Sequence, residues 1–169
     1  MKKKIAILGS TGSIGKTLIE IIKKDKKNYR TILLTANKNY KKLYKQALIL
    51  NAKNLIITDK KSFNIQFKKT KNLDINVFNN FNSFEKIFKK KIDYVMSSII
   101  GIDGLLPTLK VIKFTKNIAI SNKESIICGW NLIKNKLKKH QTKFIPVDSE
   151  HFSIWYGLLN NEREIEKVI

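Results

Sequence analysis

The chain contains one cysteine, two prolines and no long apolar run among its 169 residues. With Cys128 as the single thiol, no disulfide can form within the chain, and the sequence favours a reducing compartment. Cys128 lies in an apolar helical pattern, so we expect a small buried side chain rather than a nucleophile. No apolar run reaches the roughly 18 residues of a membrane span. The short run after Lys2 to Lys4 is no signal peptide, which predicts a cytoplasmic protein without a membrane partner.

Acidic residues are scarce: there are 13, against 34 lysines and arginines, and the formal net charge is +21. Such a charge is typical of nucleic-acid-binding proteins, whose cations replace counterions on phosphates. However, Arg30 and Arg163 are the only arginines, although arginine is the preferred reader of phosphates and guanines. The lysines alternate with Asn and Ile along the whole chain, as AT-rich coding would produce. We therefore expect no nucleic-acid partner, and a basic nucleic-acid-binding domain stays the alternative function.

Short β-rich runs alternate with longer amphipathic segments throughout the sequence. This pattern is typical of an α/β fold with a doubly wound, mainly parallel sheet, as in Rossmann-like NADP-binding domains. The expected strands are residues 5–8, 30–36, 54–58, 74–78, 94–98, 117–121 and 144–147. The expected helices are residues 14–22, 40–50, 62–69, 83–90, 105–114 and 123–139.

Glycine is sparse too, yet three of the seven glycines lie close together at Gly9, Gly12 and Gly15. They follow the apolar run at 5–8 and overlap the start of the helical pattern at 14–22. Glycines let the backbone turn tightly and approach a pyrophosphate, which the N–H groups of the helix start then face. The spacing is a variant of the dinucleotide fingerprint. Its position after a strand favours nucleotide binding over an ordinary strand-to-helix turn.

The end of the second expected strand, at 30–36, distinguishes NAD from NADP. An NAD site normally has an acid there that binds the ribose hydroxyls. This sequence has Asn37, Lys38 and Asn39 instead. Lys38 would attract a 2′-phosphate and the amides could hydrogen-bond to it, so NADP is favoured. The alternative is that Lys38 is one solvated lysine among many.

Two carboxylates follow the apolar run at 144–147, at Asp148 and Glu150. In an extended chain, side chains at i and i+2 share a face, so both would point together. Their oxygens suit Mg²⁺ or Mn²⁺, with a third ligand from elsewhere. A helix cap formed by Asp148 and Ser149 is an equally weighted alternative. His151 could support a metal ligand or contact the substrate, but a lone histidine at a helix start is more often structural.

A second polar group, Asn122, Lys123 and Glu124, lies at another strand-to-helix junction. A lysine there can hold a substrate phosphate or hydroxyl, and the Asn and Glu can bind a ribose or an amide. The alternative is a plain helix start with a favourable acid in its first turn. In parallel sheets the carboxyl ends of strands are where ligands bind. Five expected strand ends carry polar clusters of this kind, which favours a common site.

Four motifs in this order and spacing resemble the 1-deoxy-D-xylulose 5-phosphate reductoisomerase family. They are GSTGSIG at 9–15, GLLPTL at 104–109, SNKES at 121–125 and PVDSEH at 146–151. The resemblance extends over essentially the whole chain, from residue 4 to about residue 157.

The resemblance implies an enzyme that isomerises 1-deoxy-D-xylulose 5-phosphate and then reduces the intermediate aldehyde with NADPH. The product would be 2-C-methyl-D-erythritol 4-phosphate, an isoprenoid precursor. A divalent metal, either magnesium, manganese or cobalt, would chelate the substrate oxygens as a Lewis acid, and nicotinamide would supply the hydride. The partner is thus a small phosphorylated sugar, and we expect the intact protein to be a homodimer in the bacterial cytoplasm.

The family's pattern also implies roles for individual residues. Cofactor binding would fall to Thr11, Gly12, Ser13, Ile14, Asn37, Lys38, Asn39, Asn122 and Glu124. Substrate binding would fall to Lys123, Ser149 and Glu150, metal binding to Asp148 and Glu150, and catalysis to Lys123, Asp148 and Glu150. Asn37 replaces the glycine that members often have there, a small departure because Asn tolerates positive φ.

The resemblance divides the chain into an NADPH-binding domain at 1–147 and the beginning of a catalytic domain at 148–169. A full-length member is more than twice as long, with a third metal carboxylate, a phosphate-binding cluster, a mobile loop and a C-terminal helical domain. None of these follows in this sequence, so we expect weak NADPH binding at best and no turnover by this chain alone. A different NADP-dependent oxidoreductase, such as an aldehyde reductase, is a less favoured alternative. Such enzymes typically need a catalytic Cys or Tyr near the nicotinamide, whereas Cys128 lies in the middle of an expected helix.

Overall fold

The computed structural model describes residues 1–70 and 73–159, with the backbone alone at 150, 151 and 159. In this described part, seven strands form one sheet in the order β4-β3-β2-β1-β5-β6-β7. Every pairing between neighbouring strands is parallel. The doubly wound parallel sheet that the sequence predicts is therefore confirmed.

The elements follow the predicted alternation closely. The strands are β1 (Lys3–Leu8), β2 (Tyr29–Ala36), β3 (Asn54–Ile57), β4 (Asn76–Phe78), β5 (Ile92–Ser97), β6 (Thr115–Ile120) and β7 (Lys143–Pro146). The α-helices are α1 (Ser13–Lys24), α2 (Tyr40–Leu50), α3 (Lys60–Thr70), α4 (Phe84–Ile87), α5 (Leu105–Val111), α6 (Lys123–His140) and α7 (Ser149–Leu159). Short 3-10 helices are η1 (Phe81–Ser83), η2 (Ile102–Gly104) and η3 (Ile112–Phe114).

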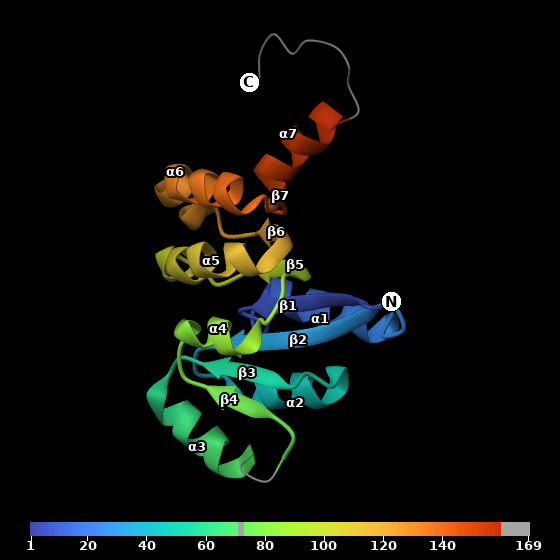
Figure 1. Cartoon of the computed structure of the whole chain (residues 1–169), viewed down its shortest axis with the longest axis vertical. Helices are drawn as coiled ribbons and strands as arrows, with labels where there is room; N and C mark the ends of the chain where they lie inside the picture. The colour runs from blue at the N-terminus through green and yellow to red at the C-terminus, as the bar shows by residue number, and fades with distance from the viewer. Residues whose placement is uncertain (71–72, 160–169) are drawn as a thin grey trace.

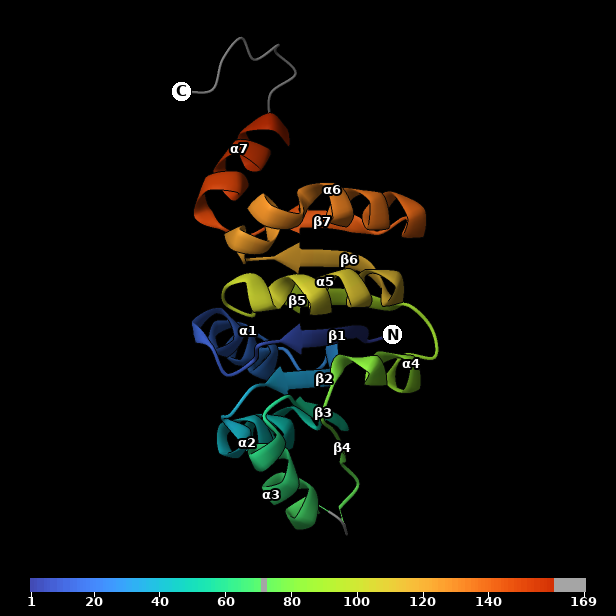
Figure 2. The same cartoon turned by 90° about the vertical axis from the view of Figure 1, so that its left-hand side faces the viewer.

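Helices cover both faces of the sheet (Figure 1). Helices α4, α5 and α6 lie on one face and α1 and α2 on the other, while α7 extends past the β7 edge (Figure 2). The strand order reverses between β1 and β5, because the chain crosses from β4 at one edge back to the middle. Such a reversal leaves a crevice at the carboxyl ends of the strands, where ligands of this fold bind.

The alternation of side chains along β1 divides the core into two layers. Ile5 and Ile7 are buried with residues of α1 and α2, such as Ile19 and Leu43. Ala6 and Leu8 point to the other face and are buried with α4, α5 and α6. A strand buried on both faces is an unbroken apolar run, which is why residues 5–8 are a strong sequence signal.

The predicted helix at 83–90 is shorter than expected. It begins with η1 and ends at Ile87, because Phe88 takes an extended conformation with φ −101° and ψ 96°. The Phe88 ring packs on Phe84 and Phe114, at centroid distances of 5.6 and 5.4 Å. Burial of this ring thus ends the helix before the three lysines that follow.

The α6 helix overturns the expectation for Cys128, which is exposed. Its buried residues are Ser125, Ile126, Gly129, Ile133 and Leu137. This set follows the helical period of one face, and Cys128 falls outside it. The apolar residues around it in sequence belong to both faces, so the run alone gave the wrong orientation.

No helix among the described residues is long and apolar enough to cross a bilayer.

Asp93 links the amino ends of three neighbouring strands, β1, β5 and β6, and we expect this link to weaken in acid. The Asp93 carboxylate accepts bonds from the Lys116 ammonium and the Lys4 N–H, both at 2.9 Å, and these bonds lower its pKa. A depressed pKa adds stability above the ordinary value of about 3.9, which is lost as the pH falls through the folded-state pKa. We expect Asp93→Asn to flatten the acid limb of urea unfolding midpoints. Glu20→Gln, in an exposed pair with Lys23, is the control that should leave it unchanged.

Candidate functional site

The glycine turn after β1 is packed so tightly that only glycine fits at two of its positions. Gly9 has φ +80°, and a Cβ there would lie 2.7 Å from the Ser98 carbonyl oxygen. A Cβ on Gly15 would lie 2.5 Å from the Gly9 carbonyl oxygen. Gly12 is different, because the nearest atom to its Cβ would be 3.4 Å away. Gly9 and Gly15 therefore shape the turn, whereas Gly12 leaves its surface open.

The start of α1 suits an anion. The N-cap is Gly12, which offers no side-chain cap, and the first turn of the helix holds no acid. Thr11 is half-buried beside it, while Ser13 and Ile14 are exposed. The helix N–H groups and the positive end of the helix dipole thus face the open side of the turn. A pyrophosphate fits this donor set without competing for a side-chain cap.

Neighbouring elements hold this turn through side chains that sequence reasoning missed. The Thr35 hydroxyl of β2 accepts from the Gly9 N–H at 2.9 Å. Gln46 of α2 is buried, accepts from the Ser10 hydroxyl at 2.8 Å and donates to the Ser10 carbonyl at 2.9 Å. A glutamine in a helical run has no sequence signal for this role, because the contact joins residues 36 positions apart.

Two adjoining cavities lie over the carboxyl ends of the strands. The smaller, of about 410 Å³, is lined by Gly12, Ser13, Ile14, Ser98, Ile99, Ile100, Ser121, Asn122, Lys123, Glu124, Val147, Asp148 and Ser149. The larger, of about 740 Å³, has Gly9, Thr11, Gly12, Thr35, Ala36, Asn37, Thr58, Phe81, Ser98, Ile99, Ile100, Ile102, Asp103, Leu106 and Pro107 in its walls. Gly12 and residues 98–100 line both. Polar groups from all five predicted strand ends therefore meet around one crevice.

The end of β2 lies mostly outside the two cavities. Asn37, Lys38 and Asn39 are all exposed, and only Asn37 lines a cavity. The Asn39 side chain accepts from the Lys42 N–H at 3.3 Å and so caps α2. Asp59 lies close enough for the Lys38 charge to contribute to its lowered pKa, although bonds from Ser62 are the larger cause. The lysine thus has an acidic neighbour that the sequence did not reveal.

More positive charge gathers beside this strand end. Lys16 of α1 and Lys42 of α2 lie together, and a hydrogen bond with Lys16 lowers the pKa of Lys42, with burial and the Lys16 charge acting in the same direction. Two neighbouring ammonium groups repel each other, so a nearby anion would be stabilised by both. The potential at this end of the crevice therefore favours a phosphate.

Asn122 is nearly buried, with 4% of its surface exposed, and its amide is fully engaged. Its oxygen accepts from the Ser125 N–H at 2.8 Å, which caps α6, and its NH₂ group donates to the carbonyls of Ile99 and Gly101. Asn122 thus fixes the loop that lines both cavities, and its predicted contact with a cofactor stays a prediction. Lys123 and Glu124 follow it, exposed on the first turn of α6.

The expected geometry of the two carboxylates is wrong. The chain is helical from Ser149, and the Phe152 N–H donates to the Asp148 carbonyl at 2.9 Å. Asp148 therefore precedes the helix and Glu150 lies in its first turn, so the i, i+2 rule for strands does not apply. The Glu150 side chain lies outside the described residues. Among the described side chains, no three His, Cys, Asp or Glu residues are placed to hold a metal.

A family model described as 1-deoxy-D-xylulose 5-phosphate reductoisomerase matches residues 5–129. The chain is 63% identical over 169 residues to the protein of that name from Pelagibacter ubique, covering 98% of this chain and 44% of that protein. It is 38% identical to the one from Wolbachia pipientis of Culex pipiens, covering 43% of it. The chain thus spans less than half the length of these relatives.

A solved structure of the Zymomonas mobilis reductoisomerase in complex with NADPH aligns with a TM-score of 0.81 at 32% identity. The alignment covers 89% of this chain and 40% of that one. A reductoisomerase in complex with NADPH, fosmidomycin and magnesium aligns with a TM-score of 0.80 at 30% identity, over 88% of this chain and 37% of that one.

Proposed function

The chain belongs to the 1-deoxy-D-xylulose 5-phosphate reductoisomerase family, and we propose that it forms the NADPH-binding part of such an enzyme. The whole protein would convert 1-deoxy-D-xylulose 5-phosphate into 2-C-methyl-D-erythritol 4-phosphate. The observation that carries this proposal is the meeting of predicted residues from separate strand ends around two adjoining cavities. A lone glycine motif would support only a nucleotide site.

In this proposal the cofactor spans both cavities across the glycine turn. Its pyrophosphate would lie on the N–H groups of Ser13 and Ile14, beside Gly12, whose own N–H donates to the Gly9 carbonyl. Its adenosine half would lie in the larger cavity toward Asn37. Lys38 and Asn39 bind the 2′-phosphate, with further positive potential from Lys16 and Lys42. Bound NADPH supplies the hydride for the reduction step.

The substrate is then placed in the smaller cavity, between the glycine turn and the starts of α6 and α7. Lys123 binds a substrate oxygen with its ammonium, and Ser149 donates a hydrogen bond to the substrate. Glu124 faces the nicotinamide end of the cofactor. Asp148 and Glu150 supply hard oxygen donors for magnesium, manganese or cobalt, with the remaining ligands from the longer part of the enzyme.

The same proposal assigns residues 1–147 to the NADPH-binding domain and residues 148–169 to the start of the catalytic domain. The boundary would fall between β7 and α7, where the chain leaves the sheet. We further propose that the intact enzyme is a homodimer, works in the cytoplasm and takes a phosphorylated sugar rather than a nucleic acid. The chain by itself would bind NADPH and turn over no substrate.

Lys38→Ala tests the cofactor assignment. The substitution should weaken NADPH binding about tenfold or more, since a charge-assisted hydrogen bond contributes about 1.5 to 3 kcal/mol. NADH lacks the 2′-phosphate, so its affinity should not change. Calorimetric titration of the 169-residue chain with each cofactor measures the two constants.

Lys45→Ala is the matched control, because it removes an exposed lysine from the second turn of α2. Its NADPH affinity should stay within about twofold of the parent chain at physiological salt. Equal losses in the two variants would mean that only the net charge matters. Equal affinity of the parent chain for NADPH and NADH would overturn the 2′-phosphate site.

A further inference from the structure

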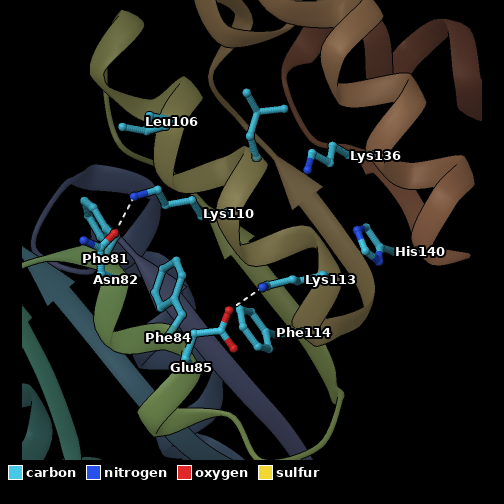
Figure 3. A pocket seen from close by; sticks show the side chains of 11 residues that line it. Phe81, Asn82, Phe84, Glu85, Leu106, Lys110, Lys113, Phe114, Lys136 and His140 are labelled. Atoms are coloured by element: carbon cyan, nitrogen blue, oxygen red, sulfur yellow. Dashed lines mark hydrogen bonds and ion pairs between the residues drawn. The ribbon is translucent and has the colours of Figure 1, made fainter.

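A separate groove lies on the α4–α5–α6 face, away from the glycine turn, with a volume of about 560 Å³ (Figure 3). Its apolar lining comes from Phe81, Phe84, Leu106, Leu109 and Phe114. These residues belong to η1, α4, α5 and η3, which surround the core cluster of this face. The volume lies within the range of small-molecule sites, which are mainly apolar with a few convergent polar groups.

The polar residues of this groove are mostly cationic. Lys110, Lys113, Lys136 and His140 line it, and Glu85 is the single acid among its lining residues. Figure 3 shows Lys110 and Lys113 reaching from α5 and η3 toward η1 and α4, and Lys136 and His140 approaching from α6.

Two of these cations also link the walls of the groove. The Lys110 ammonium donates to the Asn82 side chain at 2.6 Å, and Lys113 pairs with Glu85. Lys113 also lies over the Phe114 ring, 4.9 Å from its centroid. These contacts link η1 to α5 and α4 to η3 across the groove. The one acid is thereby neutralised, which leaves a net positive groove.

His140 reports on the charge around it. Partial burial lowers the pKa of its imidazole, and the charges of Lys136, Lys139, Lys91 and Lys113 lower it further. Lys136 and Lys139 lie on its own helix, Lys91 precedes β5 and also donates to the His140 carbonyl, and Lys113 lies on η3. A site where four ammonium groups repel a fifth cation is one where a dianion would be stabilised.

We propose that this groove binds a small organic phosphate, with its apolar body against the phenylalanine and leucine side chains and its phosphate beside Lys136 and His140, which lie one turn apart on α6. An inorganic anion would make no use of the apolar lining, and a neutral apolar molecule would make no use of the cations. A ligand that carries both an apolar part and an anionic part contacts both kinds of lining residue. Phe81 and Leu106 also line the larger cofactor cavity, so the two sites share a wall.

Phenyl phosphate is a suitable probe, since it joins an aromatic ring to a phosphate. We expect the imidazole resonances of His140 to shift in a saturable way when the ¹⁵N-labelled chain is titrated with it. The dissociation constant should be at least tenfold lower than for inorganic phosphate, and benzyl alcohol should give no saturable shift. The bound dianion should also raise the pKa of His140. This test requires no NADPH, so it is independent of the proposed cofactor site.

Lys136→Gln should weaken phenyl phosphate about threefold to tenfold. Lys134→Gln, with the same charge change on an α6 residue outside the groove, should leave the affinity within twofold. Both positions are exposed, and unchanged backbone spectra would show that the variants fold. The proposal fails if inorganic phosphate binds as well as phenyl phosphate. It also fails if both variants weaken binding equally, because the +21 charge would then account for the effect.

Discussion

Gly15→Ala is expected to destabilise the chain by about 3 kcal/mol or more, at the upper end for overpacked sites. The new methyl group would lie 2.5 Å from the Gly9 carbonyl oxygen and 2.6 Å from the Ser10 Cα. Both atoms belong to backbone that β2 and α2 hold in place, so neither can move without breaking other bonds. The melting temperature should fall by roughly 10 °C, since 1 kcal/mol corresponds to about 2–4 °C at this size.

Gly12→Ala is expected to weaken NADPH binding while leaving the stability of the fold nearly unchanged. Its methyl group would meet only the Gly9 carbonyl oxygen, at 3.4 Å, and its φ of −72° suits any residue. Stability should therefore fall by less than about 1 kcal/mol, the cost of alanine at an N-cap. NADPH affinity should fall at least tenfold, because the methyl group covers the donors that face the pyrophosphate. An unchanged affinity in a folded Gly12→Ala chain would move the cofactor away from this turn.

The difference between these glycines shows where sequence reasoning reaches its limit. The motif places all three in a phosphate-binding turn, and nothing in the spacing separates Gly9 and Gly15 from Gly12. Only the packing does, because Gly15 lies against backbone of the same turn and Gly9 against backbone of the loop after β5. The fold was easier to predict from the sequence than the roles of these glycines, since buried strands are apolar runs whose ends are marked by polar residues.

The site was predictable where it depends on strand ends and less so where it depends on packing. The strand ends at Lys123 and Asp148 were found from sequence because apolar runs stop beside them. The cap at Asn39, the acid at Asp59 and the fully engaged amide of Asn122 depend on contacts across loops. The carboxylate pair was placed on a strand because a short polar segment carries no period of its own.

Gln46→Met is expected to cost about 2 to 3 kcal/mol in the free energy of unfolding, even though the shape of the side chain is kept. Gln46 is 5% exposed and makes two hydrogen bonds to Ser10, which would lose a donor and an acceptor together. Gln66→Met is the matched control. Gln66 is 2% exposed, and its NH₂ group has no hydrogen-bond partner among the described residues. Its replacement should leave stability unchanged or raise it.

Gln46→Glu distinguishes lost bonds from lost packing through its pH dependence. The introduced carboxylate can still accept from the Ser10 hydroxyl, but its second oxygen faces the Ser10 carbonyl, where only a donor is tolerated. Protonation restores that donor, so the pKa of the introduced carboxyl is raised in the folded state. Stability relative to the parent chain should therefore be greatest below the ordinary Glu pKa of about 4.3, and should fall as the pH rises through the raised value. Urea unfolding at matched pH values measures this stability difference.

If the stability difference between Gln46→Glu and the parent chain is the same at every pH, then Gln46 only fills space, and Gln46→Met should be nearly neutral as well. A recovery at acid pH would show that the turn after β1 depends on a donor supplied by α2. The helix next to the proposed 2′-phosphate site would then also position the proposed pyrophosphate site.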